Sequence, residues 1–129
     1  MHRKALKLTE SASNWSENRD LAVRSRFKDY NKKHPRELAS CFVNLGQVME
    51  LLNRHGGVKG FQVGFFKSEG KNVYRIGQTG VKHAQETRLY VHLDEASRCV
   101  RVLTIGDKSS QSDDIRRCHE VAKNLKGEG

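Results

Sequence analysis

Residues 35–57 read PRELASCFVNLGQVMELLNRHGG, and the spacing of their apolar side chains predicts one long amphipathic helix. Pro35 suits the first position of a helix, and Gly56 and Gly57 follow as a stop signal. The apolar residues recur every three or four positions and therefore share one helix face: Leu38, Phe42, Leu45, Met49 and Leu52. We expect this face to form the core of the fold and not a ligand site.

A second helix is predicted on the N-terminal side, over residues 16–32. Its apolar side chains share one face: Val23, Phe27 and Tyr30. Its basic residues form either a solvated face or a face that contacts phosphates: Arg19, Arg24, Arg26 and Lys28. The break at His34-Pro35 would join the two helices as an antiparallel hairpin. Before them, residues 4–9 alternate weakly between apolar and polar and predict a short strand.

After Gly57 the apolar period changes to two, which is typical of strands. Strands are expected over residues 61–67, 73–76, 88–93 and 99–105, with a polar loop at 77–86 and a final helix at 112–125. Helices and strands are thus segregated along the chain, and the fold class is α+β. The expected architecture is a short N-terminal strand, a two-helix hairpin, a small twisted antiparallel sheet of three to five strands and a C-terminal helix.

Length and composition indicate one basic domain spanning residues 1–129, with 126–129 as a frayed tail. The chain has 24 Lys and Arg against 15 Asp and Glu, a net charge of +9, so a polyanion such as RNA, DNA or the ribosome is the expected partner. The three cysteines and six histidines show no metal-ligand spacing, and neither a metal nor a cofactor is expected. Without a signal segment or a membrane-length apolar run, the expected location is the cytoplasm.

A polar strand face is the candidate site. Arg88, Tyr90 and His92 alternate along one expected strand, so one side of the sheet can present all three. The other candidates are basic residues on a neighbouring strand, in two loops and after the last strand: Arg75, Lys71, Lys82, His83 and Lys108. Such side chains are also ordinary on the exposed face of an amphipathic strand, and the residues alone leave both interpretations open.

This set of residue types suits cleavage of an RNA phosphodiester. The 2′-hydroxyl must lose a proton, the charge on the phosphorus oxygens must be stabilised, and the leaving oxygen must gain a proton. Arginine stabilises such charge with fixed planar donors. Histidine carries protons near neutral pH, and tyrosine can stack on a base.

A family resemblance adds to this interpretation. The segments Thr87-Arg88-Leu89-Tyr90-Val91, Asp94-Glu95 and 100–108 (VRVLTIGDK) resemble the end of toxins of the RelE/ParE superfamily. The order of elements over residues 4–125 is similar too. The resemblance implies that Arg88 contacts the reacting phosphate, that Arg75 takes the place of a basic residue on the preceding strand, and that Lys108 takes that of one after the last strand.

The resemblance implies a toxin of a type II toxin–antitoxin pair that cuts mRNA on the ribosome without a metal and is neutralised by a cognate antitoxin. Arg88 and Arg75 would stabilise the phosphate, and His83 or His92 would move protons, because residues 113–115 hold no tyrosine where RelE has one. Contacts with the nucleic acid are expected from Lys71, Lys82, Tyr90 and Lys108. The alternative is a non-catalytic basic module: a toxin directed at DNA gyrase, or a general RNA- or DNA-binding protein.

Overall fold

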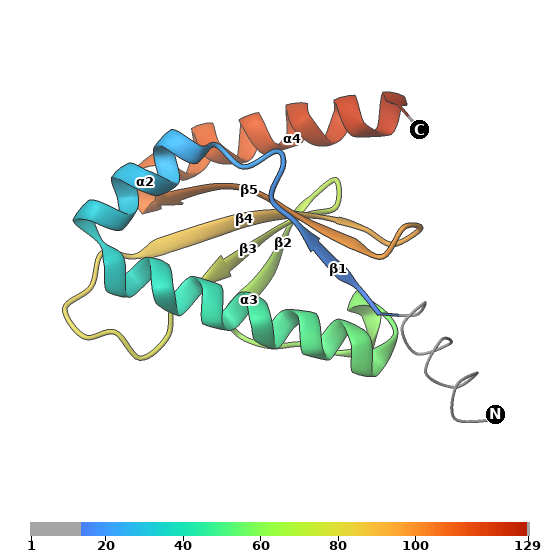
Figure 1. Cartoon of the computed structure of the whole chain (residues 1–129), viewed down its shortest axis with the longest axis horizontal. Helices are drawn as coiled ribbons and strands as arrows, with labels where there is room; N and C mark the ends of the chain where they lie inside the picture. Colours follow the sequence, from blue (N-terminus) through green and yellow to red (C-terminus); the bar gives the residue numbers. More distant parts are fainter. Residues whose placement is uncertain (1–13, 129) are drawn as a thin grey trace.

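Five strands form one sheet in the order β1-β5-β4-β3-β2 in the computed structural model, which describes residues 14–128. The strands are β1 (Ser16–Asn18), β2 (Phe66–Gly70), β3 (Val73–Gly77), β4 (Thr87–Asp94) and β5 (Cys99–Asp107). The helices are α2 (Arg24–Lys33), α3 (Pro35–His55) and α4 (Gln111–Glu128), with short 3-10 turns at Val58–Gly60 and Lys108–Ser110. Helices α3 and α4 lie on opposite sides of the sheet (Figure 1). The expected α+β class is confirmed.

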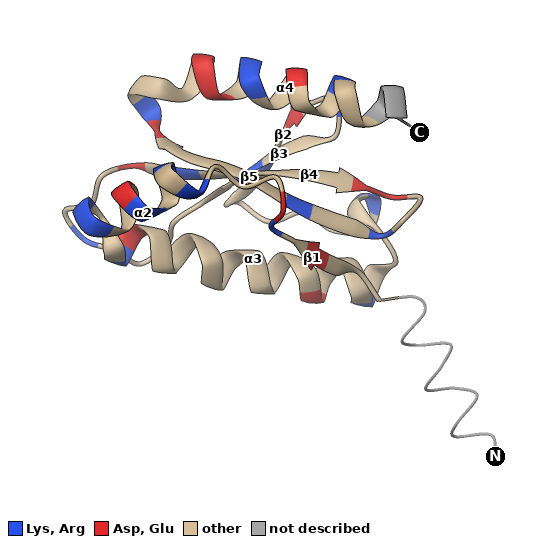
Figure 2. Cartoon of the chain, turned by 45° about the horizontal axis from the view of Figure 1, so that its top comes forward, with Lys and Arg blue, Asp and Glu red and all other residues tan. Residues whose placement is uncertain are grey.

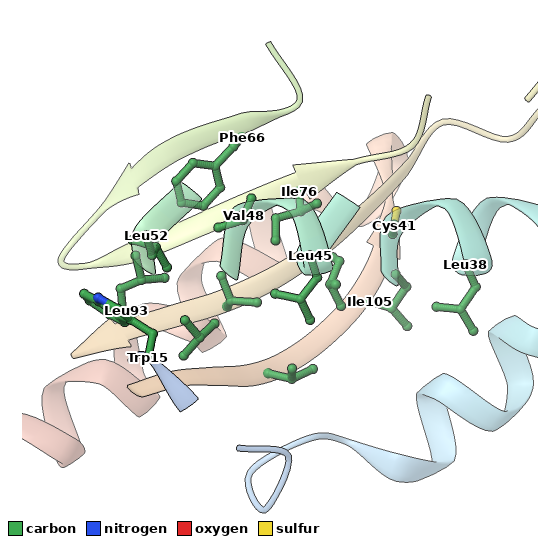
Figure 3. Close-up of a cluster of buried hydrophobic side chains, with 14 of the residues drawn as sticks. Trp15, Leu38, Cys41, Leu45, Val48, Leu52, Phe66, Ile76, Leu93 and Ile105 are labelled. Atoms are coloured by element: carbon green, nitrogen blue, oxygen red, sulfur yellow. The ribbon is translucent and has the colours of Figure 1, made fainter. Parts of the chain in front are cut away.

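The main core lies between α3 and the sheet, where the predicted apolar face of the helix packs (Figure 3). Leu45, Val48 and Leu52 are each at most 1% exposed and lie against strand residues such as Ile76 and Leu93. Helix α3 begins at Pro35, and the residue after it, Gly56, has the left-handed backbone (φ 76°) that favours glycine. The sequence-based prediction of this helix is therefore confirmed.

A smaller core lies on the other face of the sheet, under α4. Cys118 and Ala122 of the helix pack against Val73, Tyr90 and Leu103 of the strands. Leu103 reaches this face because the β4–β5 register pairs Tyr90 with Thr104 and Val91 with Val102, which leaves Leu103 as the extra residue of a β-bulge. The sheet is consequently covered by a helix on each side.

The segment before α2 differs from the predicted helix over 16–32. Residues Ser16–Asn18 form β1, which runs parallel to β5, and the backbone N–H of Ser16 donates to the carbonyl of Arg98. The Asn18 side chain then accepts from the N–H of Asp20, a local turn that competes with helix formation. The sheet is thus mixed and not wholly antiparallel. The strand predicted at 4–9 lies outside the described residues.

The first hairpin is shifted from its predicted position. The strand expected at 61–67 begins only at Phe66 and continues to Gly70. Lys71 and Asn72 form the turn, and both have positive φ (55° and 64°), as the central residues of a type I′ hairpin turn do. Phe61 and Val63, which suggested a strand, pack on the edge of the main core as irregular chain.

Charged residues are distributed unevenly over the helices (Figure 2). Helix α3 has none between Leu38 and Met49, whereas half of the ten residues in α2 are Lys or Arg. Within residues 14–128, no helix is both long enough and apolar enough to cross a membrane.

Candidate functional site

The predicted polar face of β4 lies under α4. Arg88, Tyr90 and His92 do share one face, opposite to the face that packs on α3. Tyr90 is completely buried against Cys118 and Ala122 of α4, and burial raises the pKa of its phenol. Contrary to the expectation, Tyr90 is therefore not exposed for stacking on a base. The sequence pattern showed the face, but not the helix that covers it.

A pocket of about 350 Å³ opens beside this face, between the β2–β3 hairpin and the loop that precedes β4. Three cationic side chains line it: Lys67, Arg75 and Arg88. We call it the arginine pocket. Its remaining lining residues are polar, small or apolar apart from one carboxylate: Gly64, Phe65, Gly77, Gln78, Thr79, Gly80, Val81, Glu86 and Thr87.

Arg88 is flanked by glycines on both neighbouring strands. Gly77 of β3 and Gly106 of β5 are its direct partners in the register. Directly paired residues point to the same side of a sheet, and the missing side chain of Gly77 leaves space beside Arg88. The space over Gly106 is filled instead, because a Cβ there would lie 2.0 Å from Oδ2 of Asp114.

The Arg88 guanidinium is largely buried and incompletely paired. Its side chain is 12% exposed, and Nη2 lies 3.7 Å from Oε1 of Glu86, a carboxylate that is itself 60% exposed. Nη1 is buried, and no residue of the described chain accepts a hydrogen bond from it. Buried donors are normally hydrogen-bonded, so a pocket-lining guanidinium with an unused N–H suits an anionic ligand.

Arg75 is held beside Arg88 by the sheet register. It pairs with Lys67 of β2 on one side and with Tyr90 of β4 on the other. Its Nε lies 3.2 Å from Oε1 of Glu69. Arg75 and Arg88 were both predicted from the sequence as site residues, and the structure brings both to one pocket. Lys67 was not predicted, because only the β2–β3 register shows that Lys67 adjoins Arg75.

The loop at residues 78–86 forms one wall of the arginine pocket and is fixed at its base. The Thr79 backbone exchanges two hydrogen bonds of 2.8 Å with the hydroxyl of Ser40 on α3. The Gln78 side chain donates to the carbonyl of Gln85 and accepts from the N–H of Thr87. These bonds close the loop on itself and hold it against α3.

Lys82 and His83 lie at the exposed end of this loop. His83 has a positive φ of 52°, and the nearby Val81 lines the arginine pocket. The two residues thus adjoin the pocket along the chain without lining it. Lys108 is exposed after β5 and does not line it either.

His92 belongs to a different region. It is four residues from Arg88 on the same strand, a separation of about 13 Å at the usual rise per residue. It is 7% exposed, and its Nδ1 lies 3.4 Å from Nη1 of Arg101. Burial and the Arg101 charge lower its pKa. His92 and Arg88 are therefore not placed to act on one phosphate. His92 lines a second pocket, separate from the arginine pocket, and Lys71 at the β2–β3 turn lines it too.

Asp114, at the position where the sequence lacks the expected tyrosine, has a structural role. It is 1% exposed and accepts from Nη1 of Arg26 at 2.8 Å and from the hydroxyl of Ser110 at 2.7 Å. This buried ion pair links α2 to α4 behind Gly106 and holds the start of α4 against β5.

The described part of the chain contains no group of three or more His, Cys, Asp or Glu residues that could hold a metal ion. The cationic side chains of the arginine pocket can offer charge and hydrogen-bond donors to an anion. No family model, curated protein or solved structure matches the chain.

Proposed function

We propose that this chain binds single-stranded RNA and holds a backbone phosphate in the arginine pocket. The observation that carries the proposal is Arg88 itself, which lines a pocket with two further cations and whose buried Nη1 has no acceptor in the described chain. A phosphate oxygen is an acceptor of the right charge for the guanidinium. The exposed Glu86, 3.7 Å from Arg88, would be displaced into water.

The recessed position of Arg88 supports a single strand over a duplex. The flexible backbone of a single strand can bend into the pocket and reach a guanidinium that is 12% exposed. The phosphates of a duplex lie along a regular cylinder and do not bend inward in this way. The net charge of +9 adds long-range attraction for any polyanion. The resemblance to RelE/ParE toxins favours RNA over DNA.

The test is fluorescence anisotropy with a short labelled single-stranded RNA and three proteins: wild type, Arg88→Gln and Arg54→Gln. Arg54 is an exposed residue of α3 and provides the same loss of charge outside the pocket. A charge-assisted hydrogen bond contributes roughly 1.5–3 kcal/mol, so Arg88→Gln should weaken binding at least about tenfold. It should also reduce the slope of log K against log salt by about one.

Arg54→Gln should weaken binding only about twofold, as expected for the loss of one distant charge. Circular dichroism of each variant establishes that it is folded at the assay temperature. If the two variants weakened binding equally, the attraction would be non-specific and the arginine pocket would not be the site. Equal binding of single-stranded DNA would remove the preference for RNA.

A second candidate function is a metal-independent endoribonuclease of the toxin type, acting on mRNA at the ribosome in the cytoplasm and neutralised by an antitoxin. Arg88 and Arg75 would stabilise the charge on the phosphate. His83 would carry the proton, because it lies two residues after Val81 of the pocket whereas His92 is distant. A cell-free translation reaction with mapped mRNA 5′ ends tests this.

Ribosome-dependent cuts that disappear in both Arg88→Ala and His83→Ala would support the nuclease. Intact mRNA with wild-type protein would contradict it and leave RNA binding as the function. Inhibition of DNA supercoiling with no effect on mRNA would instead favour the toxin directed at gyrase.

A further inference from the structure

A second pocket, of about 660 Å³, contains His92, a predicted site residue that the proposed function does not use. It lies between the β2–β3 turn, the end of the β4–β5 hairpin and the last turns of α4, and His92 lines it. We call it the histidine pocket. Its lining is Lys71, Asn72, His92, Leu93, Asp94, Glu95, Ala96, Arg101, Ala122, Lys123 and Leu125. The volume is in the range of small-molecule sites.

His92 is a fixed, neutral hydrogen-bonding group of this pocket. It is 7% exposed, and its lowered pKa keeps the imidazole uncharged at neutral pH. Arg101 can only donate, so the 3.4 Å contact of its Nη1 makes Nδ1 of His92 the acceptor. The neutral ring then carries its proton on Nε2, which makes Nε2 a donor. Arg101 is held in turn by Asp94, whose Oδ2 lies 3.4 Å from Nη1.

The other lining groups fall into three chemical kinds. Lys71 and Lys123 are exposed cations, one on the hairpin turn and one on α4. Asp94 supplies a carboxylate. The carboxylate of Glu95 lies instead beside Gly57, where a Cβ would be 3.1 Å from its Oε2. Ala122 and Leu125 supply aliphatic surface from α4. A simple anion would meet the Asp94 carboxylate here, and a purely apolar ligand would meet four charged side chains, so neither suits the whole lining. The four charged side chains are those of Lys71, Asp94, Arg101 and Lys123.

We infer that the histidine pocket binds a ribonucleotide. Lys71 and Lys123 would contact its phosphate, and the carboxylate of Asp94 would accept hydrogen bonds from the ribose hydroxyls. The base would lie on Ala122 and Leu125. The Nε2–H of His92 would donate to a ring nitrogen or carbonyl of the base.

The ribonucleotide has two sources: a free mononucleotide, or one nucleotide of an RNA strand. The chemistry of recognition is the same in both. The inference goes beyond the proposed function, because none of the residues that line the arginine pocket lines the histidine pocket. Either pocket can therefore fail its test while the other stands.

The test is a titration of the full chain followed by ¹H–¹⁵N NMR. The probes are adenosine 5′-monophosphate, its 2′-deoxy analogue, inorganic phosphate and a short 5′-phosphorylated RNA. The reporters are the backbone amides of Asn72, Ala96 and Ala122. Saturable shifts at these amides with the ribonucleotide, and weaker ones with the deoxy analogue and with phosphate, are the expected result.

Lys123→Gln should weaken ribonucleotide binding about threefold or more, as expected for the loss of one exposed phosphate contact. Lys33→Gln, at an exposed lysine in the last turn of α2, should leave it unchanged. Arg88→Gln should also leave these shifts unchanged while it weakens binding of the RNA strand, which separates the two proposals.

Shifts with the RNA strand but not with the mononucleotide would support the pocket as a subsite of that strand. Equal shifts with inorganic phosphate would overturn the inference, because the pocket would then bind a plain anion. Equal affinity for the deoxy analogue would overturn the assigned contact with the ribose 2′-hydroxyl. No shifts at the three amides with any probe would overturn the inference as a whole.

Discussion

Replacing Tyr90 with phenylalanine should stabilise the protein. The Tyr90 side chain is completely buried between β4 and α4, and no residue of the described chain hydrogen-bonds to its hydroxyl. A buried hydroxyl without a partner destabilises a fold by about 1–3 kcal/mol. Phenylalanine keeps the ring and its packing, so the free energy of unfolding should rise by about 1 kcal/mol. For a chain of this length, this corresponds to an increase in Tm of about 4 °C.

Tyr30→Phe is the matched control, because the Tyr30 hydroxyl is buried but lies 2.7 Å from the hydroxyl of Thr87. Losing that hydrogen bond should lower the free energy of unfolding by about 1 kcal/mol. Urea unfolding followed by fluorescence of Trp15, the single tryptophan and 5% exposed, measures both variants. If Tyr90→Phe destabilised the protein as much as Tyr30→Phe does, its hydroxyl would be well hydrogen-bonded and the reasoning would be refuted.

Four further variants test other features. Gly46→Ala should raise the free energy of unfolding by about 0.5–1 kcal/mol in a thermal melt, because a Cβ there enters open space within α3. Gly106→Ala should lower Tm sharply and by more than Gly46→Ala raises it, because its Cβ would overlap the Asp114 carboxylate at 2.0 Å. Arg26→Ala should lower the free energy of unfolding, measured in urea, by about 3 kcal/mol, since it leaves the buried Asp114 carboxylate without its cation. A decrease of less than about 1 kcal/mol would contradict this. Burial lowers the pKa of His92 below its ordinary value of 6.5, so the unfolded chain takes up the proton at a higher pH than the folded chain does. The contribution of His92 to the free energy of unfolding is therefore fully present above pH 6.5 and should decrease as the pH falls below it. His92→Gln should flatten this part of the curve of stability against pH, and an unchanged curve would contradict the assignment.

The parts of the fold that depend on local periodicity could be predicted from the sequence. Helix α3 has an apolar stripe, a proline at its first position and a glycine after its end, and all three act within a few residues. The shared face of Arg88, Tyr90 and His92 follows from the period of two in a strand. Pairing of β1 with β5 could not be predicted this way, because three residues carry no measurable period.

The candidate site depends on contacts between distant segments and was predicted only in part. Arg75 and Arg88 could be named from their residue type and their strands. Lys67 could not be placed beside Arg75 without the register of β2 on β3. The burial of Tyr90 depends on which face of the sheet α4 covers, and the amphipathic pattern of α4 does not specify that face. The separation of His92 from Arg88 required only the strand rise.

The pairing of β1 with β5 has a consequence for the order in which the chain can fold during synthesis. Ser16 pairs with Cys99, so the first described strand meets its partner only after more than eighty further residues have been made. Contacts so distant in sequence close late, because a long loop must first be brought together. On a translating ribosome, α3 and the β2–β3 hairpin can form early, whereas Trp15 and β1 wait for β5 to leave the exit tunnel. The β1 edge of the sheet is thus completed only after β5 has emerged.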